Sequence, residues 1–298
     1  MTPARRIQFA KACFLHACRL DVAVRKPGNV SAVSPGHGMD AQRFIASAQA
    51  AAAPLFEAGA RVGPRIEAAM AASLAVAGCN TNLGIVLLCA PIAAAVERVD
   101  SLASAQQLRA AVAAVLADLD LADAQAAYRA IARVNPGGLG HAPAQDVRAA
   151  PSVDLRAAMA LAAPRDNIAA QYANDYADLF ELALPALQPG FTPMRVIADG
   201  VADVDTAACV QRVYLLLLGK LADSHIVRKH GEPVAQTVMR SAQGWLATAA
   251  PEQDPAFAAW DESLKARGIN PGTSADLTVA ALLLAALLAP DGAAWHET

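Results

Sequence analysis

Residues 78–99 read GCNTNLGIVLLCAPIAAAVERV, and this stretch decides the fold class. The run from Leu83 to Val96 is apolar and is bounded by Asn82 and Glu97. A second apolar run, Leu277 to Pro290, has the same length. Each run is shorter than the roughly 20 residues that a helix needs to cross a bilayer. We therefore predict two buried core helices and no membrane span.

Alanine dominates the composition around these two runs. Hydrophobic residues make up 55% of the 298 residues, whereas aromatic residues make up only 5%. Alanine has the highest intrinsic helix propensity and lets helices approach each other closely. No run of alternating β-branched residues is long enough to predict a strand. The sequence thus predicts an all-α protein, folded as a single compact multi-helix domain over residues 1–298.

Glycine and proline residues separate the expected helices. Two long loops are predicted at 26–38 and 135–152, because both stretches are rich in these two residue types. The turn at 78–84 leads into the first central helix, which is expected to run to Val99. The other expected helices cover 4–22, 39–60 with a break at Pro54, 63–77, 104–118, 122–133, 153–163, 166–186, 202–222, 231–249, 254–267 and 274–289.

The net charge indicates which partners the protein can bind, and the cysteine content indicates the cellular compartment. The formal net charge of -3 gives no general attraction to nucleic acid or to an anionic membrane. The N-terminal segment lacks an uninterrupted apolar stretch, so no signal peptide is expected. The five cysteines form no C-x-x-C pair, which favours reduced, buried thiols. We expect a cytoplasmic protein with a small-molecule ligand; the oligomeric state stays open, with a homodimer as one arrangement.

Polar segments that interrupt the apolar framework are the candidates for chemistry. The first reads KPGN at residues 26–29 and is followed by Met39-Asp40. A lysine beside proline and glycine is well placed to reach a phosphate, because a small residue lets backbone and ligand approach. The alternative is a surface turn with an exposed lysine.

The second polar segment surrounds the start of the first central helix. Glu67 could coordinate Mg²⁺ or act as a base, but Arg65 lies two positions away and so points about 200° from it. Asn80, Thr81 and Asn82 directly precede the apolar helix. Exposed N–H groups at a helix start form an anion site, and ordinary capping needs only one of these three side chains.

Three further polar segments lie in the second half of the chain. Asp166 follows Pro164-Arg165 and could simply cap its helix. The stretch DSHIVRKHG at 223–231 could hold a metal-bound phosphate, or it could be a solvated helix end with cations favoured by the dipole. The stretch NPGTSAD at 270–276 is explained mostly by capping of the last apolar helix.

Taken together and in this order, these segments resemble the triphosphoribosyl-dephospho-CoA synthase family of the citrate lyase and malonate decarboxylase systems. The matching stretches are Lys26-Pro27-Gly28, Met39-Asp40, Arg61 through Glu67 to Gly78-Cys79-Asn80-Thr81-Asn82-Leu83-Gly84, Asp223 to Lys229, and Pro271 to Asp276. They span most of the chain. No single match is specific, but five in register are hard to reach by chance.

The resemblance implies transfer of the 5-triphosphoribosyl group of ATP to the 2'-hydroxyl of dephospho-CoA, with release of adenine. It also implies Mg²⁺ as the clamp on the triphosphate. The residues implied as catalytic are Glu67, Asp223 and Asp40, and those implied as metal ligands are Glu67, Asp223 and Asp276. The residues implied in nucleotide or phosphate binding are Lys26, Asn29, Arg65, Asn80, Thr81, Asn82, His225, Arg228, Lys229 and Ser274.

Two positions depart from the family pattern. The family's His-Lys pair in Asn-Thr-His-Lys-Gly is Asn82-Leu83 here, and the Asn of the later motif is His225. The central motif therefore lacks a titratable group and a cation. Two alternatives follow: an ATP-dependent transferase with another acceptor, such as an intermediate of one-carbon cofactor biosynthesis in methylotroph-type metabolism, or a non-catalytic nucleotide-binding helical protein.

Overall fold

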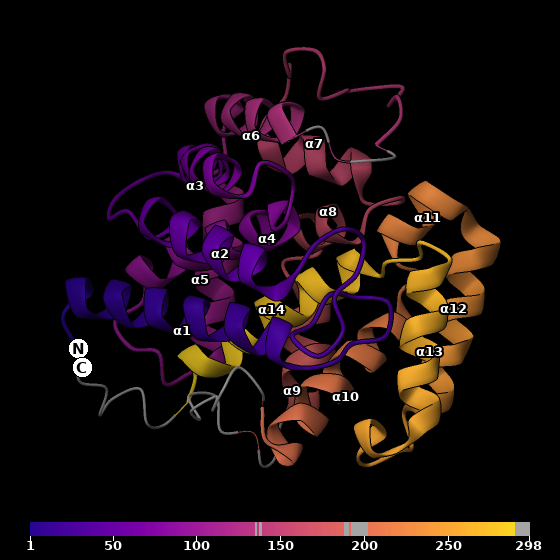
Figure 1. Cartoon of the computed structure of the whole chain (residues 1–298). Helices are drawn as coiled ribbons and strands as arrows, with labels where there is room; N and C mark the ends of the chain where they lie inside the picture. The colour runs from indigo at the N-terminus through magenta and orange to yellow at the C-terminus, as the bar shows by residue number, and fades with distance from the viewer. Residues whose placement is uncertain (135, 137–138, 188–190, 192–201, 290–298) are drawn as a thin grey trace.

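Two helices that are apolar on every side lie at the centre of the molecule, α4 (Leu83–Arg98) and α14 (Gly272–Leu287) (Figure 1). Every residue of α4 from Leu83 to Val96 is buried, and α14 is buried almost throughout. The two helices contact each other. A helix that is hydrophobic all round needs neighbours on all sides, which is why the other helices gather around this pair.

The structure is a computed structural model, and it describes residues 1–134, 136, 139–187, 191 and 202–289. These residues contain no β-strand, only two isolated bridges in the loop that follows α1. The all-α prediction is therefore confirmed. The helices around the central pair are α1 (Pro3–Ala23), α2 (Ala41–Leu55), α3 (Val62–Ala77), α5 (Ala105–Ala117), α6 (Leu121–Val134), α7 (Leu155–Ala162), α8 (Asn167–Ala173), α9 (Leu184–Leu187) and α10 (Val204–Lys220).

Three C-terminal helices stand beside this bundle: α11 (Ser224–His230), α12 (Glu232–Trp245) and α13 (Pro255–Ala266) (Figure 1). They enclose a second, smaller hydrophobic cluster with α10, in which Trp245 packs edge-on against Phe257 at 5.1 Å between ring centroids. The loop after α1 is tied to α13, because the Gly28 N–H donates to the buried Asp261 carboxylate at 2.8 Å. One compact helical domain results.

Helix α4 contains Pro91, and a buried tyrosine compensates for it, with a second tyrosine bound to the next carbonyl. A proline has no N–H, so the carbonyl four residues earlier, that of Leu87, loses its helical partner. The Tyr172 hydroxyl donates to the Leu87 carbonyl at 2.7 Å, and the Tyr176 hydroxyl donates to the Leu88 carbonyl at 2.9 Å. The part of α4 before Pro91 is thus fixed to α8 through Tyr172 and to the segment after α8 through Tyr176.

The helix predicted over 166–186 is interrupted. Helix α8 ends at Ala173, Asp175 and Tyr176 adopt positive φ angles of 54° and 60°, and a π-helical turn (Asp178–Ala183) precedes α9. Positive φ is unfavourable for side-chain-bearing residues. Here the buried hydroxyl contact of Tyr176 holds that conformation, which hydrophobic periodicity does not reveal. Residues 224–230, expected as a helix end, form the separate helix α11.

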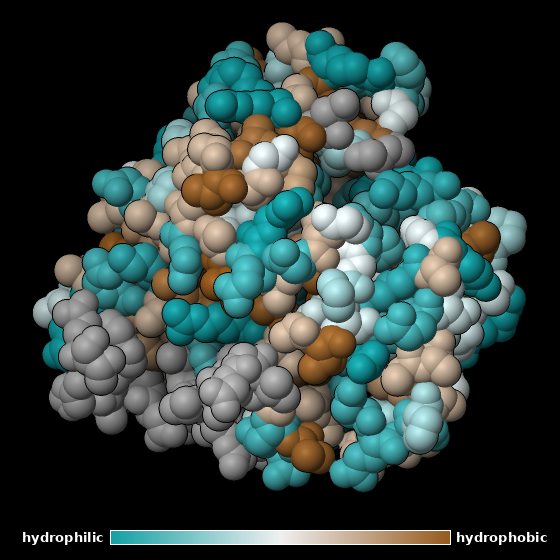
Figure 2. All heavy atoms as spheres, in the orientation of Figure 1, coloured by the Kyte–Doolittle hydropathy of each residue, from teal (hydrophilic) through white to brown (hydrophobic). Residues whose placement is uncertain are grey.

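The face of the molecule drawn in Figure 2 carries hydrophobic residues scattered among hydrophilic ones. Such scattering is normal for a water-exposed surface. Among the described residues, none of the helices combines the length and the hydropathy of a bilayer span. The five cysteines are all free thiols, and four of them are buried.

Candidate substrate cavity

A cavity of about 390 Å³ lies where the starts of α4 and α14 meet helices α6, α7, α8 and α11. Residues of the loop between α6 and α7 line it as well. Small-molecule sites typically have volumes of about 300–1,000 Å³. The cavity therefore has the size of a substrate site, built from segments that lie far apart in the sequence.

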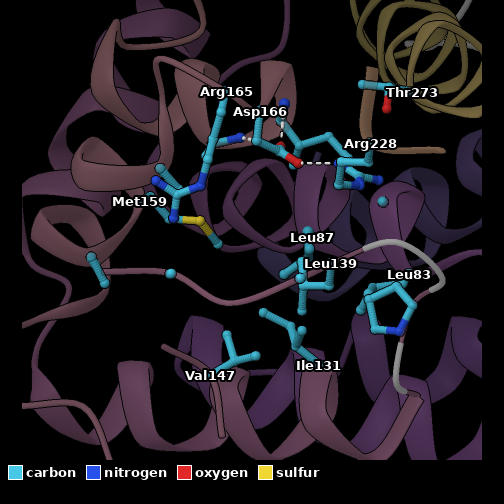
Figure 3. A pocket seen from close by; sticks show the side chains of 18 of the residues that line it. Leu83, Leu87, Ile131, Leu139, Val147, Met159, Arg165, Asp166, Arg228 and Thr273 are labelled. Carbon is cyan, nitrogen blue, oxygen red and sulfur yellow. Dashed lines mark hydrogen bonds and ion pairs between the residues drawn. The ribbon is translucent and has the colours of Figure 1, made fainter. Parts of the chain in front are cut away.

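Asp166 and Arg228 form the polar side of the cavity (Figure 3). One carboxylate oxygen of Asp166 accepts the N–H groups of Ile168 and Ala169 and caps α8. The other oxygen accepts from the Arg228 guanidinium at 2.6 Å. The guanidinium Nε of Arg228 is buried without a partner among the described residues. Arg228 is thus held in place with hydrogen-bonding capacity left for a ligand.

Asp276, in the first turns of α14, also lines the cavity. Its carboxylate lies against the backbone of Gly84, so closely that a Cβ atom at position 84 would overlap Oδ2 and come within 2.6 Å of Cγ. Among the described residues it has no hydrogen-bond or ion-pair partner. Burial and the nearby Asp21 and Asp223 raise the pKa of Asp276 well above its ordinary value.

The surroundings of Asp276 carry an excess of negative charge. Four carboxylates lie close enough to interact electrostatically, those of Asp276, Asp21, Asp223 and Asp166. The cations near them are Arg228 and Lys26, and the Lys26 ammonium lies 3.0 Å from Asp21. Unbalanced buried carboxylates are costly unless they are protonated or meet a cation. This part of the cavity therefore suits a positively charged ligand atom or a metal ion.

His225 lines the same part of the cavity, but as a neutral ring. Burial lowers the pKa of His225 to about 3, and the cations Lys229 and Arg228 add to the effect. Its Nε2 atom is buried without a partner among the described residues. His225 can thus offer a ligand a hydrogen bond at neutral pH, but it cannot serve as a cation.

Apolar side chains form the opposite side of the cavity (Figure 3). Leu83 and Leu87 come from α4, and Met159 comes from α7. Ile131 near the end of α6 and Val147 of the following loop complete this side. A cavity with one polar and one apolar side accommodates a ligand that has both kinds of surface.

The loop between α6 and α7 is held over the cavity by local hydrogen bonds. The Tyr128 hydroxyl donates to the Gln145 carbonyl at 2.7 Å. The Asp146 carboxylate accepts from the Ala142 N–H at 2.7 Å and from the guanidinium of Arg148. The Arg148 guanidinium and these N–H groups keep the pKa of Asp146 below its usual range. Asp146 therefore shapes the loop, and its charge is already balanced by Arg148.

Of the residues predicted for the site, the structure brings Asn80, His225, Arg228 and Asp276 to the cavity. The Asn80 side-chain oxygen accepts the Leu83 N–H at 3.1 Å and caps α4. Thr81 and Asn82 are buried next to it, where they bond to Ser47 and Ser73 respectively. They support the start of α4 and do not line the cavity.

Several predicted phosphate-binding residues have structural partners instead. Lys26 is fully buried and neutralises Asp21, to whose backbone carbonyl it also donates. Asn29 bonds to Asn270 at 3.0 Å, so it fastens the loop after α1 to the chain before α14. Lys229 is exposed and does not line the cavity. A phosphate held by Lys26 is incompatible with the burial of that side chain.

Arg65, Glu67 and Asp40 lie outside the cavity. Arg65 is buried and is paired with Glu97, so its charge is used inside the fold. Glu67 forms a two-pronged ion pair with Arg129, both contacts at 2.7 Å, on an exposed surface. Asp40 is exposed and caps α2. The structure shows structural contacts for these three residues, and their catalytic or binding roles stay predictions.

Asp223 and Ser274 connect the starts of two helices. One Asp223 oxygen accepts the N–H groups of His225 and Ile226, and the other accepts the N–H and the hydroxyl of Ser274. Asp223 is fully buried and does not line the cavity. It therefore fixes α11 against α14, and its role as a metal ligand or base stays a prediction.

Replacing Glu67 with Gln separates the predicted from the observed role. We expect activity within about twofold of wild type, because the side chain lies outside the cavity. Exposed ion pairs contribute roughly 0–1 kcal/mol, so thermal stability should also change little. Steady-state rates and melting temperatures check both statements. A loss of rate by orders of magnitude would return Glu67 to the catalytic machinery.

The apolar side of the cavity and the pairing of Asp166 with Arg228 are not predictable from the sequence. An aspartate that only caps a helix has the same sequence pattern as one that caps a helix and also binds an arginine. The sequence therefore indicates capping for Asp166, but not its pairing with Arg228. Leu83 stands out only as a departure from a motif. The lining residues of the loop between α6 and α7, among them Leu139 and Val147, carry no signal beyond their place in a long loop.

Over its described residues, the chain is an all-α protein with a small-molecule cavity that has one polar and one apolar side. A family described as ATP:dephospho-CoA triphosphoribosyl transferase, CitG, matches residues 7–294. The chain therefore belongs to this family, and the family makes it a transferase.

A solved structure supports the fold. The chain is similar to the crystal structure of a protein described as a candidate triphosphoribosyl-dephospho-CoA synthase from Archaeoglobus fulgidus. The TM-score is 0.61 at 20% identity, over 82% of this chain and 98% of that one. At this level of identity the likeness establishes a shared fold. No match was found among curated proteins.

Proposed function

We propose that this protein transfers the 5-triphosphoribosyl group of ATP to a hydroxyl group of an acceptor and releases adenine, with dephospho-CoA as the acceptor that the family description names. The observation that carries the proposal is the cavity itself. Arg228, an unpaired Asp276 and the start of α14 lie together on its polar side. These are the groups that a metal-bound polyphosphate requires.

The residues on this side fit Mg²⁺. Among the described residues no cluster of three or more metal-ligating side chains occurs, so a complete protein cage is not available. Magnesium usually takes only one or two carboxylates, with water and phosphate oxygens as its other ligands. Asp276 would hold the ion, because its carboxylate reaches the cavity and lies in surroundings with excess negative charge. When bound, the ion would neutralise charge on the triphosphate.

Arg228 would bind phosphate oxygens from the other side. Its contact with Asp166 fixes the orientation of the guanidinium, and its buried Nε has no partner among the described residues. Charge-assisted hydrogen bonds from a fixed guanidinium are strong and directional. The Ser274 N–H at the start of α14 already donates to Asp223, but the N–H groups of Gly272 and Thr273 lack partners within the helix, and the helix dipole there favours an anion. Thr273 brings this helix start to the cavity.

The transfer breaks the bond between C1 of the ribose and N9 of adenine, and the electron pair leaves with adenine. The acceptor oxygen forms the new bond to C1, and its hydroxyl proton ends on adenine, so the reaction is balanced in protons. Positive charge develops on the ribose as the bond breaks. Exclusion of water matters here, because water could replace the acceptor. The apolar side of the cavity and the loop between α6 and α7 would supply this exclusion.

Adenine release tests the proposal. The protein is incubated with ATP, Mg²⁺ and dephospho-CoA, and the products are separated by chromatography. Adenine that forms only when an acceptor is present supports the transfer. ADP or AMP would indicate phosphoryl or nucleotidyl transfer instead. Binding of ATP without adenine release, across a panel of hydroxyl acceptors, would leave a nucleotide-binding protein without catalysis.

A further inference from the structure

We propose that a second phosphate subsite lies at the rim of the cavity, where Lys229 and His230 of α11 and His37 of the loop after α1 lie near His225, and that it holds the pyrophosphate group of the acceptor. This inference rests on the proposed transfer reaction and gives its second substrate a place to bind. The triphosphate of the donor would keep Arg228 and the metal ion on Asp276.

The cavity itself does not balance the charge of two nucleotides. Among the described residues, its lining includes two arginines, Arg165 and Arg228, and the carboxylates of Asp146, Asp166 and Asp276. A metal ion on Asp276 would add positive charge for one polyphosphate. The volume of about 390 Å³ also lies near the lower end of the range for a single small-molecule ligand. One of the two substrates must therefore extend across the rim, and its phosphates need cations there.

Helix α11 carries basic side chains from the cavity to the surface. Residues three and four apart in a helix are neighbours, so Arg228 and Lys229 lie on the same face as His225. His225 and Arg228 line the cavity (Figure 3), whereas Lys229 is exposed and lies outside it. Lys229 has no ion-pair partner among the described residues. Its ammonium group is therefore available to an anion that extends out of the cavity along α11.

Two histidines border this face of α11, and backbone carbonyls hold their rings. His230 Nε2 donates to the Gly268 carbonyl at 3.1 Å, and His37 Nε2 donates to the Gly28 carbonyl at 2.8 Å. Gly28 lies against the chain before α14, because a Cβ atom on it would come within 2.9 Å of the Ile269 carbonyl oxygen. A carbonyl oxygen only accepts, so each ring carries its proton on Nε2. The Nδ1 atom of each ring has no hydrogen-bond partner among the described residues.

The polar side of the cavity is divided into a negative part and a positive part. Around Asp276 the neighbouring charges are mostly carboxylates, which suit a metal ion. Burial lowers the pKa of His225, and four basic groups act on it in the same direction: Lys229, Arg228, His37 and His230. The buried Nε2 of His225 has no partner among the described residues, so this ring offers a hydrogen bond where the two parts meet. A phosphate group without a metal ion therefore fits the positive part.

Calorimetric titration of dephospho-CoA into the full-length protein tests the subsite, at low ionic strength because salt screens exposed charges. The variant is Lys229→Ala, and Lys229→Arg restores the charge. The matched control is Lys220→Ala. Lys220 is also an exposed lysine in the last turn of a helix, but it is not among the groups that act on His225. Mg²⁺-ATP and adenosine, which lacks the pyrophosphate, serve as comparison probes.

We expect Lys229→Ala to bind dephospho-CoA about tenfold more weakly than wild type, since one charge-assisted hydrogen bond is lost. Lys220→Ala should bind it as wild type does, and Lys229→Arg should bind it more tightly than Lys229→Ala. Mg²⁺-ATP and adenosine should bind all four proteins equally. Equal binding of dephospho-CoA by wild type and Lys229→Ala would overturn the inference, and so would an equal loss in Lys220→Ala. A loss for Mg²⁺-ATP in place of dephospho-CoA would assign Lys229 to the donor and overturn it as well.

Adenine release separates this inference from the proposed function. In Lys229→Ala the KM for dephospho-CoA should rise about tenfold relative to the KM for ATP. A protein that releases adenine, with a KM for dephospho-CoA that Lys229→Ala leaves unchanged, keeps the proposed transfer and loses the subsite. A protein that shows the expected binding and releases no adenine keeps the pyrophosphate subsite and loses the transfer. Dephospho-CoA that neither binds nor supports adenine release would overturn both.

Discussion

The Asp276→Asn variant should unfold at a higher temperature than wild type and should lose nearly all of its transfer activity. The carboxylate lies in surroundings with excess negative charge, where burial and neighbouring carboxylates raise its pKa. An amide of nearly the same shape removes the cost of that charge. We expect this change to stabilise the fold by about 1 kcal/mol and to raise the melting temperature by about 2 °C. The amide is also a poor ligand for Mg²⁺, so the rate should fall by roughly 10²–10³.

The pH dependence of stability shows whether the charge of Asp276 causes the expected difference in melting temperature. Because the folded-state pKa of Asp276 is raised, the folded protein holds this proton more tightly than the unfolded chain does. This contribution to stability is complete below about pH 4, the unfolded value, and is lost as the pH rises through the folded pKa. The Asp276→Asn variant lacks this titrating group. The difference in stability between the variant and wild type should therefore grow as the pH rises from about 4 through the folded-state pKa of Asp276. Melting curves from about pH 4 to about pH 9 measure this directly.

Asp40→Asn is the matched control for this experiment. Asp40 is an exposed cap of α2, and Asn caps a helix about as well as Asp. We expect its activity and its stability to stay close to those of wild type. If instead Asp276→Asn were less stable than wild type at every pH, the carboxylate would be ionised and paired in the folded protein, and the excess of negative charge around it would not exist.

A single methyl group at Gly84 should also inactivate the enzyme. In Gly84→Ala the new Cβ would overlap Oδ2 of Asp276 and would lie 2.6 Å from its Cγ and 2.7 Å from Cδ1 of Ile168. Either the carboxylate or the start of α4 must move. Overpacking of this kind costs about 1–3 kcal/mol. A displacement of about 1 Å at a reacting centre can lower the rate by roughly 10²-fold.

Gly244→Ala is the matched control, because it makes the same glycine-to-alanine change in a helix away from the cavity. Gly244 lies in α12, and no atom lies within 4 Å of the position that its Cβ would take. Alanine in a helix is favoured over glycine by about 1 kcal/mol, so this variant should be slightly more stable and fully active. Denaturant unfolding and adenine release compare the two variants. Full activity in Gly84→Ala would mean that the position of Asp276 does not limit the rate.

The helical framework could be predicted from sequence because its signals are local. The two apolar runs identify α4 and α14 as the buried centre, and the boundaries of most other helices follow from proline, glycine and capping residues. The interruption after α8 could not be predicted this way. It depends on hydroxyl contacts from Tyr172 and Tyr176 to α4, which join residues 85 and 88 positions apart.

The site was predicted only in part, for a physical reason. A motif specifies which polar residues are close in sequence, but not whether each side chain faces a ligand or a neighbouring helix. Lys26 and Asp223 have the residue types of a phosphate clamp and a metal ligand, yet both are fully buried with protein partners. Arg228 and Asp276 have equivalent chemistry and do reach the cavity. Only the packing distinguishes the two pairs.

The place of α14 in the chain has a consequence for synthesis in the cell. This helix forms half of the central pair, yet it is made after the helices that surround it. A growing chain folds from its N-terminus as it emerges, so the earlier helices must wait with their inward surfaces uncovered. C-terminal truncations that remove α14 should consequently precipitate during expression, and full-length yields should improve when translation is slow or chaperones are abundant.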